Sequence, residues 1–125
     1  GDPPVTGRSA RHAANLVGVH GEARVARALE RAGWAVLSRN WRGGGGELDL
    51  VVERSGALRM VEVKTRASGD PVGLEAVGSA KQRKLTGAAR AWLLEHDPQY
   101  DEVAFMVVLV EPDGITILDD AFDVE

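Results

Sequence analysis

The sequence predicts an α/β domain in which one mixed β-sheet is flanked by helices. Two stretches carry apolar residues at helical spacing, and five shorter stretches are rich in apolar and β-branched residues. They follow one another in the order α-β-β-β-α-β-β, and one predicted strand is apolar almost throughout, which is typical of a strand buried on both faces. The 125 residues are enough for a single domain with a hydrophobic core.

The first helix is predicted from about Asn15 to Ala32. Apolar side chains recur along one of its faces at spacings of three and four, and Gly33 is a suitable helix stop. Residues 1–14 contain two prolines and few large apolar groups, so we expect a flexible N-terminal arm ahead of a single domain at residues 15–125. The residues of the predicted buried face are Val19, Ala23, Ala26 and Leu29.

Five strands and a second helix are predicted to follow. The second and third strands flank the turn signal Ser55-Gly56 and should form an antiparallel hairpin. Ser79 and Gln82 have the spacing of a capping box that opens the second helix, and Asp97-Pro98 ends it. Gly43–Gly46 is expected to be a flexible loop. The predicted strands are Trp34–Ser38, Glu47–Val52, Ala57–Lys64, Val103–Val110 and Ile115–Leu118, and the helix is Ser79–His96.

Composition and charge exclude some classes of protein and leave a nucleic-acid binder open. The absence of cysteine excludes a disulfide scaffold and a thiolate zinc site, and it fits a cytoplasmic location. No apolar run is long enough to predict a membrane span or a secretory signal. The net charge is -4, but all 15 Lys and Arg residues lie in residues 1–94 and none in the acidic residues 95–125. This asymmetry fits either a basic face for a phosphate backbone or an acidic end that only aids solubility.

The chemistry-bearing residues begin with Glu62-Val63-Lys64. Side chains alternate along a strand, so Glu62 and Lys64 share one face. The predicted hairpin brings Asp49 beside them, with Glu47 on the same face of its strand and Leu48, Leu50 and Val52 on the other. A cross-strand salt bridge on a solvated face would give the same pattern.

Glu22 makes a functional cluster the stronger interpretation. It falls on the apolar face of the first helix, where a carboxylate must be ion-paired, hydrogen-bonded or bound to a metal. Taken alone, a structural ion pair is the simpler explanation. Together with Asp49 and Glu62, however, Glu22 would offer oxygen ligands suited to Mg²⁺, and Lys64 could orient an attacking water or stabilise developing negative charge.

The ordered set of motifs resembles the YraN family, whose members are predicted endonucleases. The resemblance rests on Gly21-Glu22, Arg39–Arg42, Gly46–Val51 and Val61–Arg66, and it extends from about Gly18 to Val110. It implies the restriction-endonuclease-like, or PD-(D/E)XK, superfamily, which is similar to archaeal Holliday junction resolvases. Such proteins use Mg²⁺ or Mn²⁺, cut nucleic acid and often act as homodimers.

Residue by residue, the resemblance implies a catalytic role for four positions. Asp49, Glu62 and Lys64 match the Asp…Glu-x-Lys core of the superfamily, and Glu22 matches its helical glutamate. Glu22, Asp49 and Glu62 would then be the metal ligands, with Glu47 as an accessory carboxylate. The predicted contacts to nucleic acid are Arg42, Arg66, Lys81, Arg83 and Lys84.

Two departures from the family pattern bear on activity. Leu48 precedes Asp49 where the motif of the wider superfamily has proline, and Ala104 and Met106 stand where the family typically has Arg and Asp. The sequence therefore predicts a metal-dependent endonuclease, with DNA the expected substrate. It leaves two alternatives: an inactive nucleic-acid-binding module of the same fold, and a protein-interaction adaptor that uses the acidic C-terminal end.

Overall fold

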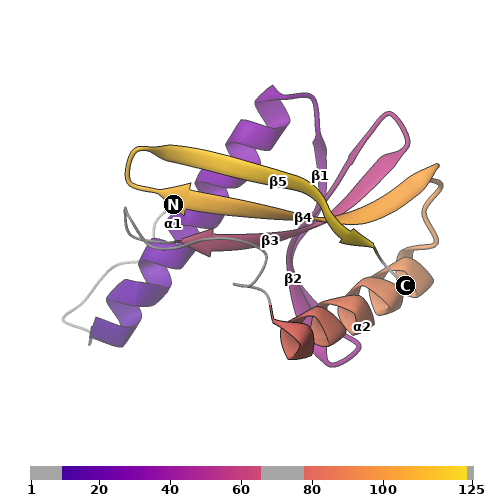
Figure 1. Cartoon of the computed structure of the whole chain (residues 1–125), viewed down its shortest axis with the longest axis horizontal. Helices are drawn as coiled ribbons and strands as arrows, with labels where there is room; N and C mark the ends of the chain where they lie inside the picture. The colour runs from indigo at the N-terminus through magenta and orange to yellow at the C-terminus, as the bar shows by residue number, and fades with distance from the viewer. Residues whose placement is uncertain (1–9, 66–77, 124–125) are drawn as a thin grey trace.

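The predicted element order is confirmed in the structure, a computed structural model that describes residues 10–65 and 78–123 (Figure 1). Side chains are described for residues 21–65 and 78–122. Arg66, one of the predicted nucleic-acid contacts, lies outside the described residues. The elements are α1 (Ala10–Arg31), β1 (Ala35–Gly43), β2 (Gly46–Arg54), β3 (Ala57–Thr65), α2 (Ser79–His96), β4 (Glu102–Glu111) and β5 (Gly114–Asp123).

The helix ends follow local chemistry, with two differences from the prediction. Helix α1 begins before the expected Asn15, because residues 10–14 are mainly alanine and arginine, which favour helix. It ends at Arg31, and Gly33 in the turn that follows has a φ of 97°. The capping box predicted for α2 is wrong: the N-cap is Gly78, without a side-chain cap, and the Gln82 N–H donates to the Gly78 carbonyl at 2.9 Å. No helix in the described part of the chain is long and apolar enough to cross a bilayer.

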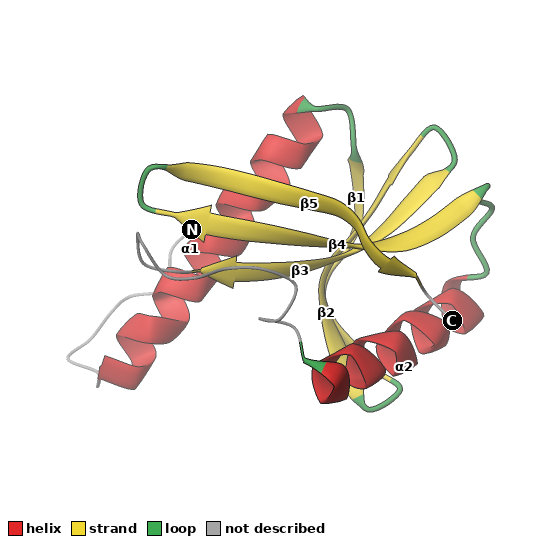
Figure 2. Cartoon of the chain, in the orientation of Figure 1, coloured by secondary structure: helices red, strands yellow, loops and turns green. Residues whose placement is uncertain are grey.

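The five described strands form one mixed sheet with a helix on each face (Figure 2). The strand order is β1-β2-β3-β4-β5, in which β3 and β4 run parallel and the other neighbours run antiparallel. Side chains of α2, led by Leu85 and Trp92, form one core with one face of the sheet. Side chains of α1, led by Val25 and Leu29, form a second core on the opposite face.

Strand β4 lies between the two cores, as its apolar sequence predicted. Phe105, Val107 and Leu109 belong to the core under α2, whereas the alternate residues Met106 and Val108 belong to the core under α1. Strand β3 alternates in the same way, because Leu58 and Met60 face α2 and Val61 faces α1. This alternation places Glu62 on the α2 face, one step after Val61.

The glycine-rich connection between β1 and β2 is a docked hairpin, and the prediction of a flexible loop was wrong. Gly44 and Gly45 form a two-residue turn with φ values of 58° and 85°, which suits the tight hairpin turn. The turn packs against the backbone of α2: a Cβ on Gly44 would lie 2.2 Å from the Gly87 carbonyl oxygen, and one on Gly46 would lie 2.3 Å from the Lys84 carbonyl oxygen. Absence of side chains is therefore what lets the hairpin and α2 meet.

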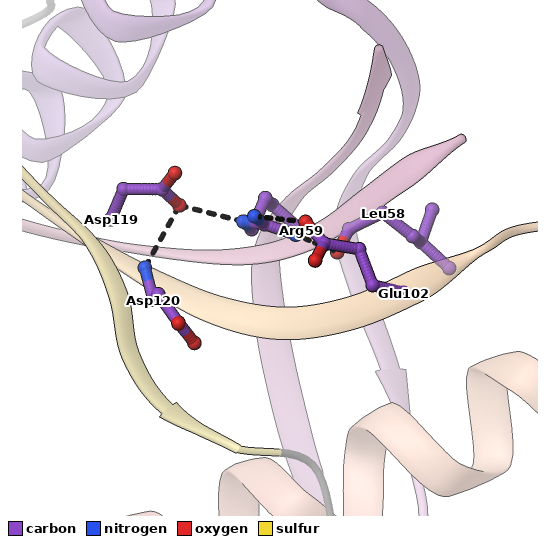
Figure 3. Close-up of polar contacts among 5 residues, drawn as sticks. All are labelled: Leu58, Arg59, Glu102, Asp119 and Asp120. Atoms are coloured by element: carbon purple, nitrogen blue, oxygen red, sulfur yellow. Dashed lines mark hydrogen bonds and ion pairs between the residues drawn. The ribbon is translucent and has the colours of Figure 1, made fainter. Parts of the chain in front are cut away.

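A buried arginine joins three strands away from the predicted acidic site (Figure 3). The Arg59 side chain is 7% exposed; its Nε donates to Asp119 at 2.6 Å and an Nη donates to Glu102 at 2.7 Å. In the β3–β4 register Arg59 lies beside Ala104, the position where the family resemblance leads us to expect arginine. The guanidinium of Arg59, on the neighbouring strand, thus occupies this part of the sheet. Met106, at the position where aspartate is expected, is an apolar residue of the core under α1.

The contact between Gly87 and the hairpin predicts that replacing this helical glycine by alanine lowers stability, which is the opposite of the usual effect. Glycine to alanine inside a helix ordinarily stabilises a protein by about 0.5–1 kcal/mol. In Gly87→Ala the new Cβ would lie 2.6 Å from the Gly44 carbonyl oxygen, so we expect a loss of about 1–3 kcal/mol in the free energy of unfolding, measured by urea denaturation. Thr86→Ala, at the neighbouring position, is the control. A Gly87→Ala variant more stable than the wild type would contradict the close packing.

Candidate active site

Asp49 lies where β2 separates from β3. The ladder between these strands pairs Leu50 with Val61 and ends there. Beyond it, Asp49 Oδ2 accepts the Val63 N–H at 2.8 Å, in place of a main-chain carbonyl. Figure 1 shows β2 curving out of the sheet toward α2. The Asp49 carboxylate is therefore held at the opening between the two strands.

The bend also breaks the alternation of side chains along β2. Leu48 belongs to the core under α2, whereas Leu50 and Val52 belong to the core under α1. The prediction that these three residues share one face was wrong, because it assumed a regular strand. The consequence is that Asp49 lies between the two layers and contacts acidic side chains from both.

Glu22 reaches Asp49 from the α1 layer. The preceding residue, Gly21, is buried, and a Cβ there would lie 3.2 Å from Thr65 Oγ1, so α1 approaches the end of β3 closely. The Glu22 carboxyl contacts Asp49, and with the Asn40 amide nitrogen turned toward Glu22, that nitrogen donates to the two carboxyl oxygens at 2.8 and 3.2 Å. Burial, followed by the negative charge of Asp49, raises the pKa of Glu22 to about 7.

Glu62 reaches Asp49 from the α2 layer. Its side chain is 8% exposed and is hydrogen-bonded to Asp49. Burial, followed by the contact with Asp49, raises the pKa of Glu62 to about 8, although Lys81 acts in the opposite direction. The raised pKa values place the proton equilibria of the two glutamates near neutral pH, and the negative charge that the cluster retains acts on Lys81.

Lys81, in the first turn of α2, is the cation beside this cluster. Its Nζ lies 3.0 Å from Glu62 Oε2. Among the described residues the buried Oε2 has no hydrogen-bond donor of good geometry, and its contact with Lys81 is an ion pair. Contact with the Glu62 carboxylate raises the pKa of Lys81. One buried oxygen of the cluster is thus left without a directed partner, which is unusual in a folded protein.

Asn40 also belongs to the site, although no role is predicted for it from the sequence. It lies opposite Asp49 in the β1–β2 register, between the pairs Arg39–Leu50 and Trp41–Leu48. Its φ of 50° is a left-handed conformation that asparagine tolerates better than most residues. The signal was its place inside the Arg39–Arg42 motif, but its contact with Glu22 depends on a helix far away in the sequence.

The remaining predicted catalytic residues lie near the cluster without joining it. Lys64 is on the same strand face as Glu62 and is half-buried, but it makes no ion pair with another described residue. Glu47 pairs with the 80% exposed Arg42 at 3.6 Å, and its negative charge contributes to raising the pKa of Glu22. The structure therefore brings together Glu22, Asp49, Glu62 and Lys81, with Lys64 adjacent.

The other predicted nucleic-acid contacts are exposed on α2. Lys84 and Arg83 both lie on its surface. Arg83 also lines an open hollow of about 840 Å³, together with Arg90 and Phe122 of β5. None of the described residues lining this hollow belongs to the acidic cluster, so its size does not make it the reactive site. A smaller hollow of about 570 Å³ is lined by Arg42, Glu47 and three glycines of the hairpin, Gly43, Gly45 and Gly46.

The donor atoms of the cluster are of the kind that bind a hard cation, but the side chains are not arranged around a cation position. Carboxylate oxygens are the ligands that Mg²⁺ takes up, and the unpartnered Glu62 Oε2 is an oxygen that a cation would satisfy. Within residues 21–65 and 78–122, however, no three acidic or histidine side chains are already placed as a set of metal ligands. The two glutamates instead hydrogen-bond to Asp49, and those protons would have to leave before a cation could bind.

The family model and the similar proteins all point to the same protein family. The sequence profile of the uncharacterised protein family UPF0102 matches residues 21–110, which include every residue of the cluster. A UPF0102 protein of Synechococcus sp. (strain JA-3-3Ab) is 50% identical over 99 residues, covering 76% of this chain and 75% of that protein. One from Nitratidesulfovibrio vulgaris (strain DP4) is 41% identical over 119 residues, covering 91% and 87%. One from Beutenbergia cavernae is 45% identical over 101 residues, covering 78% and 84%.

The raised pKa values predict how stability depends on pH. Glutamate has a pKa of 4.5 in the unfolded chain, against about 7 for Glu22 and about 8 for Glu62 in the folded protein. The folded protein therefore binds more protons, and its free energy of unfolding falls as pH rises through this range, by on the order of 2 kcal/mol, with Glu62 contributing most.

Urea denaturation in the presence of a chelator, over roughly pH 5–9, measures this effect. Glu62→Gln should flatten the upper part of the profile, whereas Glu30→Gln, at an exposed position of α1, should leave it unchanged. A wild-type profile identical to that of Glu62→Gln would show that Glu62 ionises normally and is not buried among acids.

Proposed function

The chain belongs to the uncharacterised protein family UPF0102, and we propose that it is a metal-dependent endonuclease that hydrolyses phosphodiester bonds of nucleic acid. The observation that carries this proposal is the convergence of two carboxyl groups, Glu22 from α1 and Glu62 from β3, on Asp49 of β2. Acids buried together raise one another's pKa values and cost stability, so a structural role alone explains them poorly.

A hard divalent cation is the ligand whose chemistry suits this cluster. Asp49 and Glu62 would hold Mg²⁺ or Mn²⁺, with Glu22 as the third carboxylate. When bound, such a cation lowers the pKa of a water molecule and neutralises charge on a phosphate oxygen. The Asn40 amide keeps the Glu22 carboxyl directed at Asp49, and the Val63 N–H fixes the position of the Asp49 carboxylate.

Cationic side chains of the chain supply the rest of the proposed chemistry. Lys64 follows Glu62 on the same strand face, where its ammonium can orient an attacking water or stabilise charge as it develops on the phosphate. Arg42, Lys81, Arg83 and Lys84 are all exposed to solvent and can contact backbone phosphates. Arg66 remains a predicted phosphate contact. Binding through such contacts weakens steeply as salt rises.

A nucleic-acid-binding module without turnover is the second candidate function. It is favoured by the hydrogen bonds that hold both glutamates on Asp49 and by the core residue Met106 at the position where the family resemblance implies aspartate. This candidate predicts the same salt-sensitive binding and no cleavage.

We expect purified protein with Mg²⁺ or Mn²⁺ to cleave at least one member of a panel of labelled linear duplex, single-stranded and branched DNA. Glu62→Gln, Asp49→Asn and Lys64→Met should each lower the cleavage rate by about 10²- to 10³-fold, because each removes charge from the reacting centre. Glu30→Gln, which neutralises an exposed carboxylate on α1, should cleave at the wild-type rate.

Two outcomes would contradict the proposal. Salt-sensitive binding of the panel without cleavage under any of these conditions would favour the binding module. Cleavage that persists unchanged in Glu62→Gln would assign the activity to a contaminating nuclease.

A further inference from the structure

The contact between Lys81 and Glu62 joins a half-exposed side chain to a buried one. The Lys81 side chain is 52% exposed, whereas that of Glu62 is 8% exposed, and their charged atoms lie 3.0 Å apart. Among the described residues no donor reaches Glu62 Oε2 with good hydrogen-bond geometry, so the contact is an ion pair between the ammonium and the carboxylate. A long, flexible side chain with one end in solvent can leave such a contact without disturbing the backbone.

Lys81 also has a particular electrostatic position. Of the described cationic side chains, it alone contacts one of the three clustered carboxyl groups, since Arg42 pairs with the accessory Glu47. The charges of Asp49 and Glu47 act on it as well as that of Glu62. It therefore lies beside Glu62 Oε2, a buried oxygen without a hydrogen-bond partner among the described residues.

We propose that Lys81 is a displaceable counter-ion: its ammonium balances Glu62 until a divalent cation binds there, and it then moves to a phosphate of the nucleic acid. This inference rests on the proposed function and adds an order of events to it. A divalent ion on Glu62 Oε2 would repel an ammonium 3.0 Å from the same oxygen. Freed from Glu62, Lys81 would stand at the edge of the site with its charge turned toward the substrate.

A purely structural role for Lys81 would have the opposite effect on cation affinity when the lysine is removed. If the ion pair serves to hold Glu62 in position, removing the lysine disorders the carboxylate and weakens cation binding. If Lys81 competes with the cation, removing it strengthens cation binding. The sign of the change therefore separates the two roles.

The experiment is a calorimetric titration of the full chain with Mn²⁺, comparing the wild type with Lys81→Met and Lys84→Met. We expect Lys81→Met to bind Mn²⁺ about five- to tenfold more tightly, because the lost ion pair no longer opposes binding. Lys84→Met removes the same charge from an exposed position one turn along α2 and should bind as the wild type does. Circular dichroism confirms that each variant is folded, and Lys81→Ala serves as a second variant.

A second measurement follows the lysine after displacement. With Mn²⁺ present, the affinity of Lys81→Met for a phosphorothioate DNA duplex, which resists cleavage, should be several-fold weaker than that of the wild type. Its dependence on salt should fall by about one phosphate contact. Undiminished affinity for DNA would overturn the transfer to phosphate.

The outcomes distinguish this inference from the proposed function. Tighter Mn²⁺ binding by Lys81→Met, with Lys84→Met unchanged, supports displacement. Equal or weaker binding by Lys81→Met overturns it and leaves the nuclease proposal intact, provided that Glu62→Gln loses Mn²⁺ binding. If the wild type binds no more Mn²⁺ than Glu62→Gln does, the proposed metal site fails, and the role of Lys81 fails with it.

Discussion

The hydrogen bond from the Val63 N–H to Asp49 Oδ2 replaces a main-chain bond at the point where β2 leaves β3. It keeps the strands apart while holding the aspartate between them, and the bend that results turns Leu48 into the core under α2. Because Asp49 then lies between the two layers, α1 can present Glu22 to it and β3 can present Glu62.

The acidic cluster costs stability, and the packing on both sides of the sheet offsets that cost. Burial of apolar surface is the main favourable contribution, and here it is divided between a core under each helix. Two local contacts keep the layers in place: the glycine turn against the backbone of α2, and Arg59 among β3, β4 and β5. The first fixes α2, which carries Lys81, against the hairpin that carries Asn40 and Asp49.

Sequence periodicity correctly predicted the order of the elements, the extent of α2 and the burial of β4 on both faces. Each of these features depends on residues that are close together in the sequence. It also placed Glu22 on the inner face of α1. The bend at Asp49, the contact of Asn40 with Glu22 and the docking of Gly44 on Gly87 could not be predicted, because each joins segments distant in the sequence. The four glycines of Gly43–Gly46 predict a flexible segment unless the helix against which they pack is known.

We propose that Glu22, Asp49 and Glu62 together form a cation site. Its most direct test is the anomalous X-ray signal of manganese in crystals of the protein grown with Mn²⁺. We expect one strong peak within bonding distance of the Asp49 and Glu62 carboxylates, with Glu22 turned toward it. Crystals in which that position has no peak and the two glutamates remain hydrogen-bonded to Asp49 would contradict it.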